Sequence, residues 1–217
     1  MSPATLARLS GGAVVIGCAL GITAHLLFRL AGQPGTIAQF ESPVWVPGQL
    51  TQVFGIALLL LGLPAVYGRQ ARRAGTFGLI AFVLLFIGTM SELMGPINGL
   101  WRAELATRPE TRSLIESRVM PSALGVIFVV FFPQLLLGAV AFGVSVIRAG
   151  VFPRAAGGLM IAGVLLDIVG GFVLRVGLFG PELVFIGLAW LGLQVMRGGA
   201  RETEHASNPE GFAVRSA

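Results

Sequence analysis

The chain has 217 residues and a formal net charge of +5 at pH 7, with 55% hydrophobic and only 12% charged residues. Soluble domains carry about 25% charged residues, because their water-facing surface must be solvated. The composition therefore argues against a soluble globule and predicts that lipid surrounds most of the chain.

The basic residues and the cysteine count exclude further classes. All 15 basic residues are arginines that separate apolar segments without forming a basic face, so we expect no nucleic-acid partner. The absence of lysine excludes a Schiff-base cofactor, and the single cysteine, Cys18, excludes a disulfide or a thiolate metal site within one chain. His25 and His205 are the only histidines, and His205 lies in the tail, which excludes a bis-histidine haem. We expect neither a cofactor nor a metal.

Six apolar stretches are each long enough to cross a hydrocarbon core as a helix of about 20 residues. They cover residues 10–30, 47–67, 74–97, 121–147, 155–176 and 181–196, and predict an all-α, polytopic transmembrane bundle in one domain, 1–198. The first stretch exceeds the roughly 7–15 residues of a signal-peptide core, so we expect it to remain as a helix. The loop 101–118 has the charge spacing of a short amphipathic helix, and the polar segment 199–217 is expected to be a disordered cytoplasmic tail.

The arginines predict the orientation of the bundle. With the N-terminus inside, the cytoplasmic segments hold nine of the 15 arginines, and four of the other six lie in the long outer loop. Basic residues favour the cytoplasmic side of a membrane. The helices that enter from outside begin with Pro47, Pro121 and Pro181, which suits the first helical turn. We therefore expect both termini in the cytoplasm.

Small residues predict where helices approach each other closely. Gly17 and Gly21 have small-xxx-small spacing in the first stretch, and Gly170 and Gly171 lie in the fifth. Cys18, between the first two glycines, is expected to be a small buried apolar residue.

Two acids within the predicted spans are the candidate catalytic residues, although no catalytic role is assigned. Asp167 lies near the middle of the fifth stretch, and Glu92 lies toward the outer end of the third. Ionisable groups inside a membrane are costly, and a carboxyl group there stays protonated unless a cation lies close. His25 and Arg175 are the expected partners at the depth of Glu92. The acids are interpreted either as a proton-relay or general-acid site, or as one ion pair and one hydrogen-bonded acid.

Other polar side chains gather in the outer half of the predicted bundle, above Asp167. A cavity that opens outward would have this distribution, and so would snorkelling side chains and hydrogen bonds between helices. The candidate binding residues are His25, Gln49, Gln52, Gln134 and Arg175.

The second half of the chain carries a recognisable series of short motifs. These are FFPQLLLG at 131–138, IRAGVFPRAAG at 147–157, PEL at 181–183 and AWL at 189–191. The series resembles a family of bacterial six-helix membrane proteins of unknown function. Ala149 and Ala156 depart from the Ser and Leu of the family's cytoplasmic turn. The resemblance implies six helices in a bacterial cytoplasmic membrane, and it implies no activity.

Three functions remain open, and the sequence leaves undecided whether the protein is an enzyme. The first is a small-solute binding, transport-type or accessory membrane protein with an outward-facing polar cavity. The second is a membrane enzyme whose acids act on a lipid or isoprenoid, by analogy with cyclases. The third is a structural subunit of a membrane complex. The expected partners are the lipid bilayer, a lipid or small-molecule ligand, and a second copy or another membrane protein.

Overall fold

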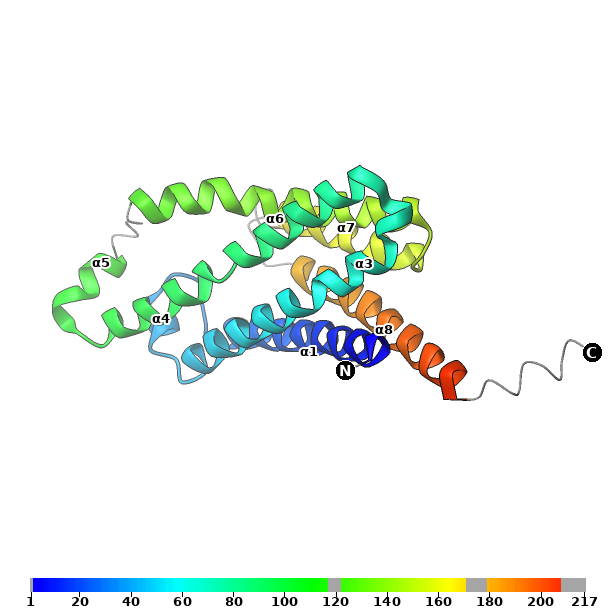
Figure 1. The fold of residues 1–217 in the computed structure, drawn as a ribbon. Helices are drawn as coiled ribbons and strands as arrows, with labels where there is room; N and C mark the ends of the chain where they lie inside the picture. Colours follow the sequence, from blue (N-terminus) through cyan, green and yellow to red (C-terminus); the bar gives the residue numbers. More distant parts are fainter. Residues whose placement is uncertain (1, 117–121, 171–178, 208–217) are drawn as a thin grey trace, which may run out of the picture.

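A computed structural model describes residues 2–116, 122–170 and 179–207, with the backbone alone for 116, 122–132 and 199–207. Figure 1 shows the order of the helices, which are α1 (Pro3–Leu30), α2 (Ile37–Phe40), α3 (Trp45–Ser91), α4 (Met94–Ala106), η1 (Pro109–Thr111), α5 (Arg112–Glu116), α6 (Ser122–Ala149), α7 (Arg154–Ile168) and α8 (Gly180–Ser207). These ranges contain no strand, so the all-α class is confirmed for the described residues.

α3 consists of two helical arms that meet at Gly75, where the backbone adopts φ 59° and ψ −159°. Glycine adopts this conformation because it has no Cβ to collide with the backbone. The chain reverses its direction there (Figure 1), and the two arms correspond to the predicted helices 47–67 and 74–97. The first arm is longer than predicted, because it stays helical through Arg69 and Arg73.

Most of the predicted loop 101–118 is helical, as its charge spacing indicated, and consists of the end of α4, η1 and α5. The last segment contains more helix than expected. α8 continues to Ser207, so the segment 199–217 does not begin as a disordered tail. Residues 200–206 (ARETEHA) include good helix formers, which prolong α8 beyond its apolar part. Residues 208–217 lie outside the described part of the chain.

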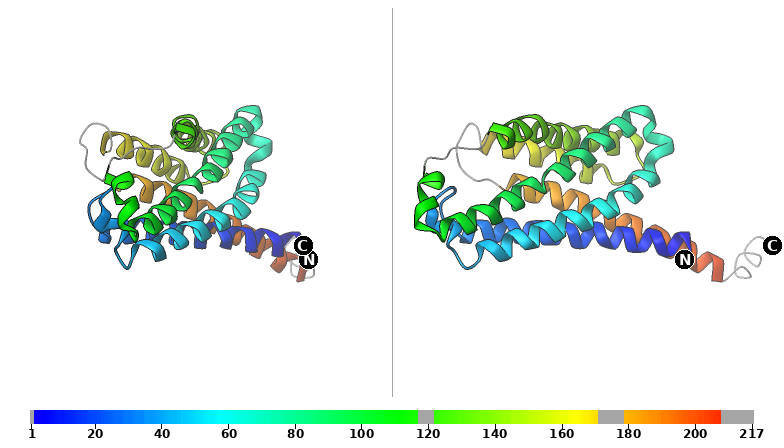
Figure 2. Two further views of the ribbon diagram at one scale, coloured as in Figure 1. Left: turned by 90° about the vertical axis from the view of Figure 1, so that its left-hand side faces the viewer. Right: turned by 60° about the vertical axis from the view of Figure 1, so that its left-hand side comes forward.

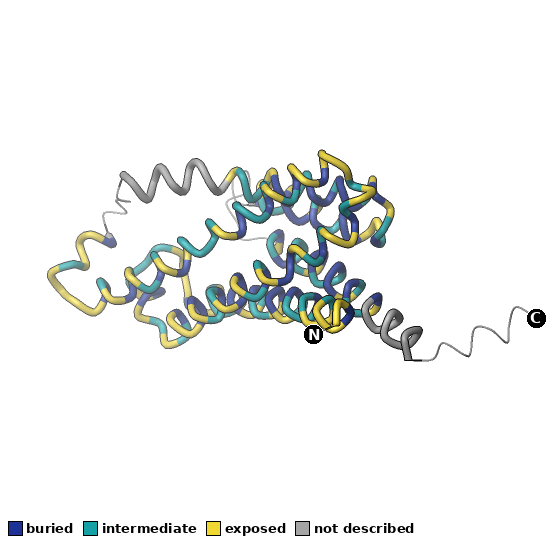
Figure 3. Tube along the Cα trace, viewed as in Figure 1, coloured by how far each residue is buried: buried dark blue, intermediate teal, exposed yellow. Residues whose placement is uncertain are grey.

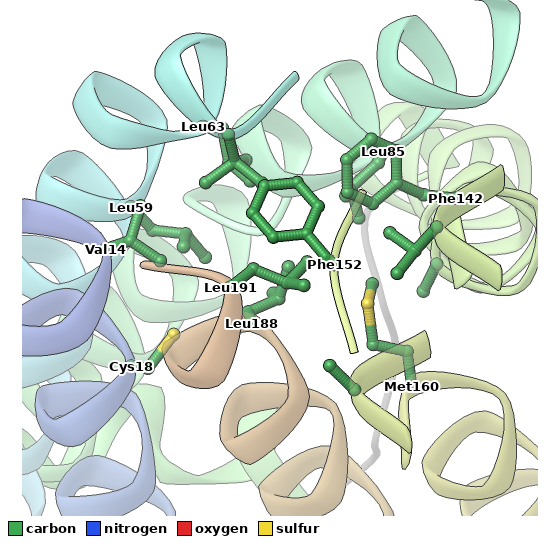
Figure 4. Packing of buried hydrophobic residues seen from close by; sticks show 14 of the residues in the cluster. Val14, Cys18, Leu59, Leu63, Leu85, Phe142, Phe152, Met160, Leu188 and Leu191 are labelled. Atoms are coloured by element: carbon green, nitrogen blue, oxygen red, sulfur yellow. The ribbon is translucent and has the colours of Figure 1, made fainter. Parts of the chain in front are cut away.

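The long helices form a ring. α1 packs against α3 and α8, α3 packs against α6, and α7 packs against both α6 and α8. The ends of the long helices form the two ends of this bundle. One of them contains the start of α1 and the far end of α8, and we call it the terminal end (Figure 2). The main core inside the ring includes Leu63, Phe142 and Met160, and Figure 4 shows Cys18 among its residues. Cys18 is fully buried, which confirms its predicted apolar role.

The opposite end of the ring carries a small subdomain, which we call the cap (residues 31–44 and 94–116). Its core consists of Ala31, Phe40, Ala103, Ala106 and Ile115 together with Trp45 from the start of α3. The Nε1 of Trp45 donates a hydrogen bond of 2.9 Å to the carbonyl oxygen of Gly99, which joins α3 to α4. An ion pair between Arg112 and Glu41 links the two parts of the cap.

Glycines allow the long helices to pack backbone against backbone, as predicted for α1. A Cβ added to Gly17 would lie 2.7 Å from the carbonyl oxygen of Gly55 in α3, and one added to Gly21 would lie 2.8 Å from the Phe185 ring in α8. Gly143 of α6 meets Gly157 of α7 in the same way, at 2.7 Å. Such close approach is typical of helices that associate without a hydrophobic driving force.

Large apolar side chains cover much of the outside of the ring, where exposed and buried residues alternate along the helices (Figure 3). Leu30 and Leu61, for example, are 74% and 71% exposed. Among the described residues, two helical segments are long and apolar enough to cross a membrane, Pro3–Leu30 and Trp45–Ala106. The second of these contains the reversal at Gly75.

Candidate functional site

Glu182 lies in the first turn of α8 and is buried, with 5% of its surface exposed. Its Oε1 accepts a hydrogen bond of 2.9 Å from Nη2 of Arg29, and the Nδ1 of His25 lies 3.9 Å from the same oxygen. The two helix dipoles favour this ion pair, because Glu182 is at the start of α8 and Arg29 is at the end of α1. The pair joins the cap-side ends of two neighbouring helices.

Aromatic rings surround this ion pair. The guanidinium of Arg29 lies 4.0 Å from the centre of the Phe179 ring. The imidazole of His25 meets Phe185 edge to face, with 5.6 Å between the ring centres. The rings limit access of water to the charges, and a cation over an aromatic face is attracted by the ring electrons.

The second carboxylate oxygen of Glu182 differs from the first in its hydrogen bonding. Oε2 is buried and has no hydrogen-bond partner among the described residues. Leaving a buried acceptor without a donor costs about 1–3 kcal/mol, and more for a charged group. Because nearly all buried polar atoms in native proteins are paired, this oxygen marks a place where a donor can bind.

Asp167, a candidate catalytic acid, lies beside the start of α8. A Cβ added to Gly180 would lie 2.6 Å from the Cβ of Asp167, so the α7 acid packs directly against the first turn that carries Glu182. Glu92 lies at the end of α3, and no hydrogen bond or ion pair among the described residues joins it to Asp167 or Glu182.

Of the two predicted partners of Glu92, His25 lies beside Glu182, because α1 packs against α8. Arg175 lies outside the described residues.

The three glutamines take different places. Gln49 and Gln52 are buried on the first arm of α3, and Gln49 packs against Gly99 of the cap. Gln134 is partly buried on α6, and its Oε1 has no hydrogen-bond partner within the described part of the chain. No hydrogen bond among the described residues joins any of them to Glu182. The structure thus brings together His25 and Asp167 from the predicted set, and adds Arg29 and Glu182.

A local signal for the two added residues is present in the sequence. His25 and Arg29 are four residues apart in one helix, so they share a face. Glu182 follows Pro181 at a helix start, where a negative charge complements the helix dipole. These two local signals predict an ion pair only if α1 and α8 are already known to be neighbours.

An aromatic row leads from this site into the cap. The ring centres of His25 and Phe28 are 6.2 Å apart, those of Phe28 and Trp45 are 5.2 Å apart, and Trp45 meets Phe40 edge to face at 5.1 Å. The successive ring contacts connect the core of the cap to His25, which lies beside the ion pair.

Among the described residues, no group of three or more His, Cys, Asp or Glu side chains is arranged to hold a metal ion. Comparisons with protein-family models, curated proteins and solved structures found no match to this chain. The function is therefore argued from the site alone.

Proposed function

We propose that the chain is an integral protein of a bacterial cytoplasmic membrane that crosses the membrane six times and binds a small cationic solute at its cap end. The crossings would be α1, the two arms of α3, α6, α7 and α8. The cap would face outward and both termini would face the cytoplasm. The ring of glycine-packed helices, the apolar side chains on its outside and the reversal at Gly75 support this arrangement.

The observation that carries the solute site is the unpaired Oε2 of Glu182. Arg29 balances the charge of Glu182, and the side chain of Asp167 packs against the same turn of α8. A ligand with a protonated nitrogen would supply the donor that Oε2 lacks among the described residues. Charge-assisted hydrogen bonds of this kind are about twice as strong as neutral ones. The protein therefore acts as a solute-binding or transport-type component, with an ammonium group held between Glu182 and Asp167.

A specific observation favours a second function, a membrane enzyme that acts on a lipid or isoprenoid. Glu92 at the end of α3 and Asp167 on α7 are both acids in apolar helices of the bundle, and one of them could protonate an apolar substrate while the other receives a proton. The two functions can be distinguished because each requires a different glutamate. Solute binding depends on Glu182, whereas protonation by the acid pair depends on Glu92.

A thermal-shift titration of the purified protein in detergent tests the solute site. We expect n-butylammonium to raise the unfolding midpoint, and n-butanol and butyrate to leave it unchanged. At 100 times its Kd, a ligand stabilises the folded state by about 2.7 kcal/mol. Glu182→Gln should abolish the shift, and Glu104→Gln, at an exposed ion pair of the cap, should keep it. Equal shifts for both variants, or for all three compounds, would contradict the proposal.

Cysteine labelling tests the crossings and the orientation. In a Cys18→Ala background, Ser113→Cys in the cap and Thr76→Cys at the terminal end are both exposed positions. A membrane-impermeant maleimide added to intact cells should label the first variant and should label the second only after permeabilisation. Labelling of both in intact cells, or the reverse pattern, would overturn the proposed orientation.

A further inference from the structure

Two turns with arginines meet at the terminal end of the ring. The first lies where the first arm of α3 ends at Gly75 and carries Arg72 and Arg73, and the second joins α6 to α7 and carries Arg148 and Arg154. The guanidinium of Arg148 lies 5.3 Å from the centre of the Phe77 ring, so the two turns are in contact. All four arginines are exposed, and we call them the arginine patch.

The arginine patch differs from the arginines at the other end of the molecule. At the cap end, Arg29, Arg108 and Arg112 each form an ion pair with a glutamate. In the described part of the chain, no ion pair involves an arginine of the patch. The segments 69–75 and 148–154 themselves contain no acidic residue.

The remaining arginine of the first turn is occupied by the protein itself. The Nη1 of Arg69 donates to the carbonyl oxygens of Gln194 and Val195 in α8, at 3.1 and 3.3 Å. Gly198 leaves the space for this side chain, since a Cβ there would collide with the guanidinium. Arg69 therefore fastens α8 to the turn, and the four exposed arginines keep their donors for another group.

An exposed apolar ridge begins beside the patch. Phe77, Ile80 and Val83 follow one another at three-residue intervals on the second arm of α3, and they are 40%, 55% and 41% exposed. Residues at this spacing lie on the same side of a helix. The ridge therefore runs from the arginines along the outside of the bundle, in the direction of the proposed membrane interior.

We propose that the arginine patch binds the phosphate of an anionic glycerophospholipid of the inner leaflet, with an acyl chain along the Phe77–Val83 ridge. Guanidinium groups match phosphate oxygens with paired hydrogen bonds, and basic residues near a membrane surface attract anionic lipids. A free phosphate ion would use the arginines alone, and only a lipid uses the arginines and the ridge together. The side of the membrane rests on the orientation proposed above.

Lipid titration of the full-length protein in mixed micelles tests this site without reference to the orientation. We expect phosphatidylglycerol to bind more tightly than phosphatidylcholine with the same acyl chains. The double variant Arg148→Gln with Arg154→Gln should lower the affinity for phosphatidylglycerol, relative to phosphatidylcholine, by roughly fivefold per arginine. Arg102→Gln with Arg108→Gln removes the same charge from the cap and should preserve the preference.

Three results would overturn the inference. One is an equal preference for phosphatidylglycerol in both double variants. Another is stabilisation by inorganic phosphate that matches stabilisation by the lipid, which would assign the patch to a free anion. The third is an unchanged lipid preference after Phe77→Ser with Ile80→Ser, which would exclude the ridge. Micelles have no sidedness, so the cysteine-labelling experiment can fail while this one succeeds.

Discussion

The ion pair between Arg29 and Glu182 makes the sharpest prediction about stability, because its two members differ in exposure. The side chain of Glu182 is 7% exposed and that of Arg29 is 35% exposed. Arg29→Gln leaves a buried carboxylate without its ion-pair partner, and the imidazole of His25 lies 3.9 Å from the same oxygen. Glu182→Gln instead leaves a partly exposed guanidinium that water can reach.

The structure sets the size of the two effects. Removing one partner of a fully buried ion pair costs about 3–5 kcal/mol, and the partial exposure of Arg29 reduces this to about 2–3 kcal/mol for Arg29→Gln. Glu182→Gln should cost about 1 kcal/mol, because the amide oxygen still accepts a hydrogen bond. The double variant removes both charges together, so its loss should fall short of the sum by about 1–2 kcal/mol.

The assay is a double-mutant cycle in reversible detergent denaturation, with Arg108→Gln and Glu104→Gln as the control cycle. The control pair is 64% and 62% exposed, so its coupling should stay below about 0.5 kcal/mol. Additive losses for Arg29 and Glu182 would refute the reasoning, and so would a coupling equal to that of the exposed pair.

Three further predictions concern packing and the backbone, and each is read from unfolding curves in detergent. Gly11→Ala should lower the free energy of unfolding by about 1–3 kcal/mol, because its Cβ would lie 2.6 Å from an α8 carbonyl oxygen. Gly12→Ala meets nothing within 4 Å and should leave the stability unchanged, so equal losses for the two variants would contradict the prediction. Gly75→Ala should lower the free energy of unfolding by about 1–3 kcal/mol, because alanine is strained in this backbone conformation. Gly68→Ala should raise it by up to about 1 kcal/mol. An unchanged stability for Gly75→Ala would contradict the backbone conformation described at the reversal. Trp45→Phe should cost about 1 kcal/mol by leaving a cap carbonyl without its donor, and an unchanged midpoint would exclude that bond.

Much of the helical pattern could be predicted from local sequence. Apolar stretches of membrane-spanning length and the glycines between them marked α1, both arms of α3, α6, α7 and α8. Helix ends were less accurate, because polar residues with good helix propensity prolong α8 to Ser207 and the first arm of α3 through Arg73. The cap core could not be predicted, since Phe40, Trp45 and Ile115 come from separate segments with no common period.

The site shows the same limit more clearly. Asp167 and His25 were singled out because a charged group in an apolar stretch is visible in the sequence. The partner of Arg29 was not, because 153 residues separate Arg29 from Glu182 and only the packing of α1 against α8 brings them together. The partner of Glu92 stays a prediction, because Arg175 lies outside the described residues.

The aromatic row from His25 to the cap gives the protein a built-in optical signal. Trp45 is buried within this row, between Phe28 and Phe40 and 5.2 Å from Phe28 between ring centres, whereas Trp101 is 49% exposed. An iodide quencher in the aqueous phase would silence the exposed indole and spare the buried one. Once the third tryptophan, the partly buried Trp190, is replaced by phenylalanine, the emission that remains would come from Trp45. Its wavelength would then report on the surroundings of Phe28 without an added label.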